Sequence, residues 1–120
     1  MTTGRMRRVD GAVRQVIGDA VGSELKDPRV GFVTVTDVRT SPDLRHARVY
    51  FSVLGAGGGP SEPQEREDSL EGLRSAHGFL QARLASELRL KRTPELEFVY
   101  DDTTDRALRL EELIDRESRQ

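Results

Sequence analysis

Apolar residues recur at steps of three and four along three stretches of the chain, which is the spacing of one face of a helix. These stretches predict helical regions over residues 6–25 and 73–88, and a last helix that follows the N-cap candidates at residues 101–105 and ends near residue 115. The apolar positions are Val9, Val13, Val16, Ile17, Ala20, Val21 and Leu25 in the first, Leu73, Ala76, Leu80, Leu84 and Leu88 in the second, and Ala107, Leu110 and Ile114 in the third. We therefore expect three amphipathic helical regions.

The other patterned segments have the composition and alternation of β-strands. Residues 30–38 are rich in β-branched side chains, and apolar and polar side chains alternate over residues 46–53. A turn sequence at residues 40–43 separates the two segments, so they are expected to pair as an antiparallel hairpin. A third alternation over residues 95–100 predicts another strand with one buried face.

The second helical stretch carries a glycine inside its apolar stripe. Glycine in a helix interior costs about 1 kcal/mol relative to alanine, so Gly78 predicts a break between two shorter helices. Amides left unpaired at the start of the second helix would attract phosphate. We expect Gly78 to act through its backbone, by a φ angle that glycine alone adopts readily or by admitting phosphate where a Cβ would intrude. The alternative is a kink that serves packing only.

The predicted order is helix, strand, strand, helix, kink, helix, strand, helix, an α+β fold with a three-stranded sheet packed against helices. A small-residue turn between two helices, beside basic residues, is compatible with a KH-like RNA-binding module. The chain fits one domain over residues 1–120, with its core at about 6–115. The N-terminus, the glycine-rich link at 55–63 and residues 116–120 are expected to be flexible. The link lacks the lysine of a phosphate-binding loop.

The formal net charge of −2 argues, taken alone, against a nucleic-acid partner. The charges are nevertheless unevenly distributed, because basic residues gather near the N-terminus and at the end of the second helical stretch. Both groups flank apolar stripes that must pack on one sheet, so we expect a single basic surface. Its members are Arg5, Arg7, Arg8, Arg83, Arg89, Lys91 and Arg92. Ordinary solvated helix faces are the alternative interpretation.

No motif for catalysis or metal binding is recognisable. The chain has no cysteine and two histidines, His46 and His77, on different predicted elements, so we expect no metal site and no cofactor. No nucleophile stands beside an orienting base, and an enzyme is not expected. Residues 1–8 lack the apolar run of a secretory signal, and no apolar run approaches the ~20 residues of a membrane span. We expect a cytoplasmic protein without membrane contact.

Several short motifs, in their order and spacing, resemble the bacterial ribosome-binding factor A family from residue 7 to about residue 113. These are Arg-Arg-Val at 7–9, Asp-Pro-Arg-Val-Gly at 27–31, Ser-Pro-Asp-Leu at 41–44, Ala-Arg-Val-Tyr at 47–50, Gly-Phe-Leu at 78–80, Pro-Glu-Leu-Glu-Phe at 94–98 and Asp-Asp at 101–102. The resemblance implies a type II KH-like domain in which an Ala-x-Gly kink, here Ala76, His77 and Gly78, replaces the usual Gly-x-x-Gly loop. Where the family commonly has a basic residue after Phe-Leu, this chain has Gln81.

The resemblance also implies a function without catalysis. Factors of this family bind the immature small (30S) ribosomal subunit and its 16S rRNA near the decoding region. They assist late rRNA maturation and cold adaptation and leave before translation, in some bacteria with help from a GTPase. We therefore expect a monomeric RNA-binding assembly factor that contacts RNA through the basic surface and through Ala76, His77 and Gly78. The alternative is a protein-interaction or dimerisation domain that uses the exposed sheet face and the acidic C-terminal helix.

Overall fold

The computed structural model describes residues 4–118 of the chain. The elements in order are α1 (Gly4–Ser23), β1 (Phe32–Thr40), β2 (His46–Leu54), α2 (Pro63–Ser75), α3 (His77–Glu87), β3 (Glu95–Tyr100) and α4 (Thr103–Ser118). The predicted order and the α+β class are confirmed. Several boundaries differ. The helix α1 ends before residue 25, and β1 begins after residue 30. Between them Val30 N–H donates to Asp27 O at 3.0 Å, so this segment is a turn. The largest difference is at α2, which begins at Pro63, ten residues before the predicted helical region and at the end of the predicted link.

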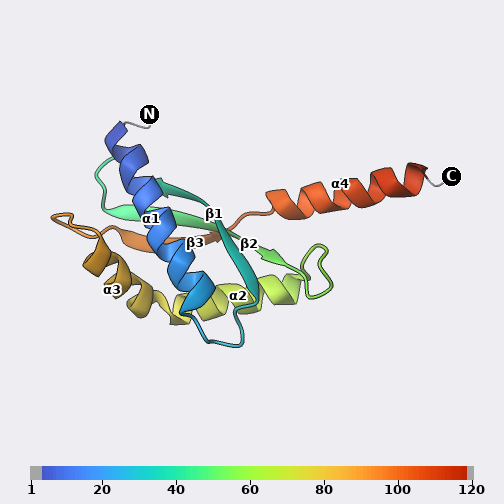
Figure 1. Cartoon of the computed structure of the whole chain (residues 1–120), viewed down its shortest axis with the longest axis horizontal. Helices are drawn as coiled ribbons and strands as arrows, with labels where there is room; N and C mark the ends of the chain where they lie inside the picture. Colours follow the sequence, from blue (N-terminus) through green and yellow to red (C-terminus); the bar gives the residue numbers. More distant parts are fainter. Residues whose placement is uncertain (1–3, 119–120) are drawn as a thin grey trace.

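The three strands form one mixed sheet in the order β1-β2-β3. β1 and β2 are antiparallel, which confirms the predicted hairpin, whereas β2 and β3 are parallel. A parallel neighbour needs a crossover, and α2 and α3 supply it. Figure 1 shows α1 running across the sheet while α2 and α3 lie along its lower side. β1 and β3 are therefore the two edges of the sheet.

A β-bulge in β1 decides which of its side chains face the core. The pairing with β2 shifts between Val35 and Asp37, so that Val35 and Val38 are both buried although three positions separate them. Strict alternation would have placed Asp37 in the core instead of Val38. The extra residue, Thr36, donates its hydroxyl to Asp101 Oδ2 at 2.8 Å and ties the bulge to the end of β3.

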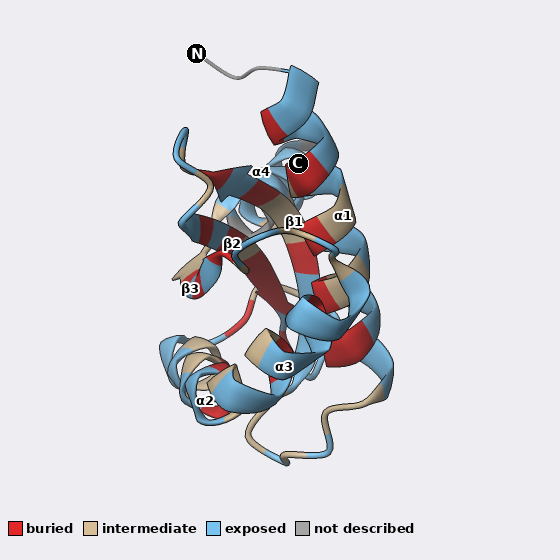
Figure 2. Cartoon of the chain, turned by 90° about the vertical axis from the view of Figure 1, so that its left-hand side faces the viewer, coloured by how far each residue is buried: buried red, intermediate tan, exposed pale blue. Residues whose placement is uncertain are grey.

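The hydrophobic core lies between one face of the sheet and the helices α1, α2 and α3. Figure 2 shows the buried segments of these elements facing one another. From β2, the alternating side chains of Ala47, Val49, Phe51 and Val53 enter the core. The helices contribute Val9, Val13, Ile17, Ala20, Val21, Leu73, Leu80 and Leu84. These include most of the apolar positions predicted for the first two helical regions.

A polar contact fixes α1 against the end of β1. The Asp10 carboxylate accepts a hydrogen bond from the Thr40 backbone N–H at 2.8 Å and another from the Thr40 hydroxyl. Thr40 is buried, so the carboxylate satisfies groups that water does not reach. The contact also sets where the first turn of α1 lies relative to the turn after β1.

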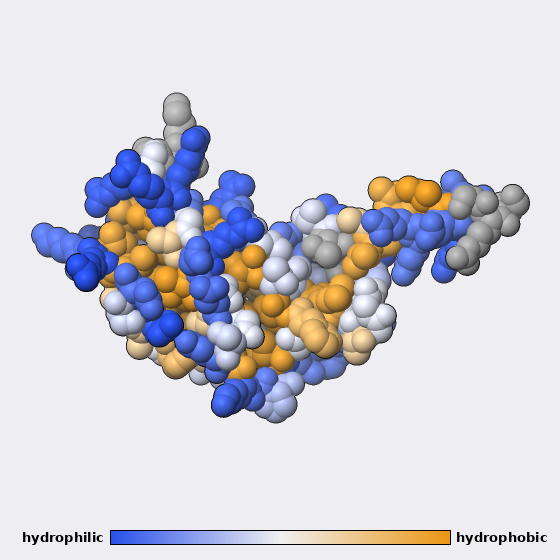
Figure 3. Space-filling model, viewed as in Figure 1, coloured by the Kyte–Doolittle hydropathy of each residue, from blue (hydrophilic) through white to orange (hydrophobic). Residues whose placement is uncertain are grey.

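The last helix, α4, projects away from the rest of the molecule (Figure 1). Its apolar face is not packed in the core, because Leu110, Leu113 and Ile114 are each more than half exposed. Figure 3 shows hydrophobic surface exposed on this projecting helix. Within residues 4–118 no helix has both the length and the apolar character needed to cross a membrane.

The segments predicted to be flexible are only partly described. Residues 1–3 and 119–120 lie outside the described residues, and α4 includes residues 116–118. In the glycine-rich link, Gly55 N–H donates to Gly59 O at 2.9 Å, which closes a turn. The flexibility of these segments stays a prediction.

The turn between α1 and β1 is held by an ion pair. Arg29 Nη2 lies 2.6 Å from Asp27 Oδ2 and 3.0 Å from Ser75 Oγ at the end of α2. The hydrogen bonds from the Arg29 side chain and backbone lower the pKa of Asp27 from 3.8 to about 2. The folded protein therefore favours the ionised carboxylate more than the unfolded chain does.

We expect the substitution Asp27→Asn to flatten the acid part of the stability profile. A depressed folded-state pKa stabilises the protein above the unfolded-state pKa near 3.8, and the stabilisation is lost as the pH falls towards 2. The parent should thus be more stable than the variant at pH 7, and the difference should vanish near pH 2. Urea unfolding at several pH values measures this, with Asp19→Asn on the exposed face of α1 as control. A difference that persists at pH 2 would contradict the assignment.

Candidate nucleic-acid interface

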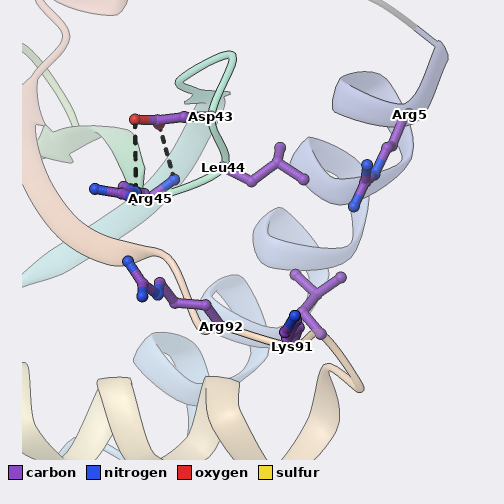
Figure 4. A pocket seen from close by; sticks show the side chains of 7 residues that line it. Arg5, Asp43, Leu44, Arg45, Lys91 and Arg92 are labelled. Carbon is purple, nitrogen blue, oxygen red and sulfur yellow. Dashed lines mark hydrogen bonds and ion pairs between the residues drawn. The ribbon is translucent and has the colours of Figure 1, made fainter.

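Basic side chains from three separate segments meet at one end of the molecule. They come from the first turn of α1, the turn between β1 and β2, and the loop between α3 and β3, and they line an open hollow of about 410 Å³. We call Arg5, Arg45, Lys91 and Arg92 the basic-end cluster. Leu44, Leu90 and one acidic residue, Asp43, complete the lining. Figure 4 shows the Leu44 side chain extending from its turn towards α1, which carries Arg5.

The turn that carries Arg45 is fixed by a carboxylate. Asp43 Oδ1 accepts hydrogen bonds from the Ser41 hydroxyl at 2.6 Å and from the Arg45 backbone N–H at 3.1 Å. These bonds, the one from Ser41 first, lower the pKa of Asp43 below its usual value. The carboxylate is thereby engaged by the turn and reaches the Arg45 guanidinium only at 3.9 Å.

The loop that carries Lys91 and Arg92 is held by the side chain of Gln81. Because β3 is an edge strand, its outer backbone groups have no strand partner. Gln81 Nε2 donates to Pro94 O at 2.7 Å, and Gln81 Oε1 accepts from Leu96 N–H at 3.1 Å. Pro94 is fully buried. Gln81 therefore fixes the point where the basic loop enters β3, a role that the sequence did not reveal.

Only one of the four cations in the cluster forms an ion pair among the described residues. Within residues 4–118, Arg5, Lys91 and Arg92 form no ion pair, and the Arg45 contact to Asp43 at 3.9 Å is the only one in the cluster. All four cations are exposed. Exposed guanidinium and ammonium groups with few acidic neighbours are suited to binding phosphate. The sequence did not single out Arg45, because it is an isolated basic residue in a turn.

The other residues of the predicted basic surface do not line this hollow. Arg7 faces Asp10 and Asp37 along a different hollow beside β1. Arg83 Nη2 forms ion pairs with Glu24 at 3.1 Å and with Glu87 at 3.6 Å. Two further predicted residues are exposed and do not line the hollow of the cluster, Arg8 and Arg89. The structure thus brings Arg5, Lys91 and Arg92 together around one hollow, which the other four predicted residues do not line.

The predicted kink exists, but its position and geometry differ from the prediction. The break between α2 and α3 is the single residue Ala76, with φ −87° and ψ 4°. Gly78 lies inside α3 and has no positive φ, so the prediction of a φ special to glycine is wrong. A Cβ at Gly78 would meet no atom within 4 Å, and whether phosphate approaches there stays a prediction.

The surroundings of His77 are less favourable to phosphate than the basic-end cluster. The half-buried His77 contacts Leu96 O through Nε2 at 3.2 Å, so the imidazole is engaged by β3. The hollow beside it is lined by one arginine and two acidic residues, Glu95 and Glu97. His77 stands at the start of α3, and the loop with Lys91 and Arg92 follows the end of this helix. The 11 residues of α3 span roughly 16 Å between the two. Among the described residues no group of three or more metal-ligating side chains is found.

Comparison with known proteins decides the family. The sequence model of ribosome-binding factor A matches residues 5–114. This chain belongs to the ribosome-binding factor A family. Its fold, an α+β domain with a three-stranded sheet and a break at Ala76 between α2 and α3, is the KH-like fold of type II.

Three structures of ribosome-binding factor A are similar to this chain. The solution NMR structure of a Thermotoga maritima protein, provisionally assigned to the family, has 35% identity and a TM-score of 0.68, over 80% of this chain and 86% of that one. The crystal structure of ribosome-binding factor A from Thermus thermophilus has 28% identity and a TM-score of 0.67, over 79% of this chain and 93% of that chain. A homology model of the Thermus thermophilus factor was fitted into a cryo-EM map of its 30S complex. It has 29% identity and a TM-score of 0.61, over 78% of this chain and 92% of that chain.

Two glycines near the break between α2 and α3 are expected to respond to alanine with opposite signs. Gly78→Ala should stabilise the fold by about 0.4–1 kcal/mol, because Gly78 is helical and its surroundings are open. At Gly72 a Cβ would lie 2.6 Å from Val30 Cγ2. Overpacking costs about 1–3 kcal/mol and outweighs a gain in helix propensity of about 1 kcal/mol, so Gly72→Ala should destabilise. Urea unfolding of both variants measures the two free energies.

The Gly78→Ala variant also shows whether Gly78 serves the structure of α3 or the binding of small subunits. A Gly78→Ala protein that is more stable and binds small subunits as well as the parent would show that Gly78 serves helix geometry only. A stable Gly78→Ala protein that loses binding would support phosphate approach at this position. A destabilised Gly78→Ala protein would contradict the open surroundings described above.

Proposed function

We propose that this chain binds the small ribosomal subunit through its rRNA, with the basic-end cluster as the phosphate-contacting surface. The observation that carries the proposal is the convergence of four exposed cations from three segments around one hollow. Membership of the ribosome-binding factor A family supports it. The fitted Thermus thermophilus factor supports the choice of the small subunit, because that protein is placed in a 30S complex.

The electrostatics favour a local rather than a global attraction to RNA. The chain as a whole carries a net charge of −2, so its overall field does not draw it to a polyanion. The four cations of the cluster instead line the same hollow, so a phosphate bound there would be attracted by several of them at once. Figure 3 shows hydrophilic side chains projecting at this end, beside the first turn of α1.

The finer functional expectations come from the family resemblance. We propose a non-catalytic factor that acts in the cytoplasm on immature 30S subunits and assists late processing of 16S rRNA. An assembly GTPase as a further partner and a monomeric state belong to the same proposal.

Sedimentation with purified ribosomal particles tests the proposal. The parent protein is mixed with isolated small subunits, large subunits or intact ribosomes and centrifuged through sucrose at several salt concentrations. We expect it to sediment with small subunits at low salt and to be released as salt rises, because phosphate contacts depend on counterion release. Equal sedimentation with all particles, or none with small subunits, would contradict a role specific to that subunit.

A protein-interaction function has its own supporting observation, the exposed apolar face of α4. Leu110, Leu113 and Ile114 are 57%, 54% and 55% exposed, and helices in proteins gain most of their stability by packing such an apolar face. An interface based on this apolar face would change little with salt, whereas the phosphate contacts would weaken steeply. The same sedimentation series therefore separates the two functions.

A further inference from the structure

One residue in the basic-end cluster adopts a backbone conformation that its side chain does not favour. Leu44 has a φ of 59° and is the only non-glycine residue with positive φ among residues 4–118. This left-handed conformation is an outlier for a bulky side chain and costs free energy. Leu44 N–H donates to Ser41 O at 2.8 Å, which closes the turn around it. The turn therefore keeps a strained leucine where asparagine or glycine would fit more readily.

The strained turn places an apolar side chain inside a ring of cations. Leu44 lines the hollow together with Leu90 from the opposite loop, while the basic-end cluster surrounds them. In Figure 4 the Leu44 side chain extends into the space between the β1–β2 turn and α1. Both leucines are half-buried and pack against the core, so the apolar floor is held in place.

An apolar floor adds nothing to the recognition of an RNA duplex. In a duplex the bases are stacked inside the helix and the phosphates lie outside, so only the cationic rim would make contact. An unpaired nucleotide can instead turn its base into the hollow while its neighbouring phosphates meet the rim. On the basis of the proposed function, we propose that the hollow between Leu44 and Leu90 receives the base of an unpaired nucleotide and directs this chain to single-stranded rRNA.

The dimensions and chemistry of the hollow fit one nucleotide. Its volume of about 410 Å³ falls in the range of small-ligand sites, roughly 300–1,000 Å³. No aromatic side chain lines it, so stacking is left to a planar guanidinium, which Arg45 and Arg92 can each provide. A stacked guanidinium keeps its charge and its N–H groups at the rim, so all four cations of the cluster can still contact the flanking phosphates.

Binding to three synthetic RNAs tests the inference. These are a short single strand, the same strand with abasic sites in its central positions, and a hairpin of equal phosphate number. Fluorescence anisotropy should show the parent binding the intact strand about tenfold more tightly than either the abasic strand or the hairpin. Equal affinities for all three RNAs would overturn the inference and leave phosphate binding by the cluster intact. Failure to bind any of them would count against both the inference and the proposed function.

Two variants connect the preference to the leucines. Leu44→Asn removes the apolar surface at this position and introduces a residue that tolerates positive φ. Leu90→Gln removes the apolar surface on the other side of the floor. Each should lose most of the tenfold preference while binding the hairpin as the parent does, with circular dichroism confirming the fold. A preference that survives in both folded variants would overturn the assignment of the floor.

Discussion

Alanine at Arg45, Lys91 and Arg92 is expected to lower the affinity for small subunits by about two orders of magnitude at roughly 0.1 M salt. Each phosphate contact contributes about 0.7–0.9 log units per decade of salt. Relative to 1 M salt, three contacts thus contribute roughly 2–2.7 log units at 0.1 M. The fold should be unaffected, since the three side chains are exposed. Sedimentation or anisotropy measurements give the two dissociation constants.

A matched control removes the same charge elsewhere. Arg106, Arg109 and Arg116 of α4 are exposed and far from the cluster (Figure 1). Replacing these three by alanine changes the net charge equally, so any general effect of charge is the same in both variants. The α4 variant should bind nearly as well as the parent. Equal losses in both variants would mean that net charge, and not the cluster, governs binding.

Gln81→Leu is expected to destabilise the protein by about 1–3 kcal/mol. Leucine has nearly the same volume but leaves Pro94 O and Leu96 N–H without the hydrogen bonds of 2.7 and 3.1 Å that Gln81 provides. Urea unfolding measures the loss. Gln15→Leu on the exposed face of α1 is the matched control and should change stability little.

The same variant probes how the scaffold supports the interface. Because Gln81 holds the loop at its entry to β3, Gln81→Leu should also weaken small-subunit binding, although its side chain does not line the hollow. Returning glutamine to position 81 should recover both the stability and the small-subunit binding. Unchanged stability in Gln81→Leu would show that the two backbone groups find other partners.

The fold was predictable because periodicity reports burial directly. The spacing of Val9, Val13 and Ile17 and the alternation of Val49 and Phe51 placed side chains that are indeed buried. The parallel pairing of β2 with β3 was not predicted, because it depends on how α2 and α3 cross over rather than on local spacing. The bulge at Thr36 was missed for a similar reason, although the three-residue step from Val35 to Val38 is its signature.

The candidate site was predictable only in part, since linear clusters do not determine three-dimensional neighbours. Arg5 joins Lys91 and Arg92 although 86 positions separate it from the nearer one in sequence. Arg7 is two residues from Arg5 but lies beside Asp10, because a helix turns about 100° per residue. Arg45 and the strained Leu44 come from a turn whose geometry no periodicity encodes. The break was predicted at Gly78 but falls at Ala76, because the helical spacing of the apolar stripe continues through both residues.

The salt dependence of small-subunit binding tests the central claim most directly. The logarithm of the association constant is measured against the logarithm of salt concentration for the parent, the Arg45, Lys91 and Arg92 alanine variant, and the α4 control. If the basic-end cluster contacts phosphates, the slope of the cluster variant should be shallower than that of the parent by about 2–3 units, and the control should keep the parent slope. Parallel lines for all three proteins would contradict the account.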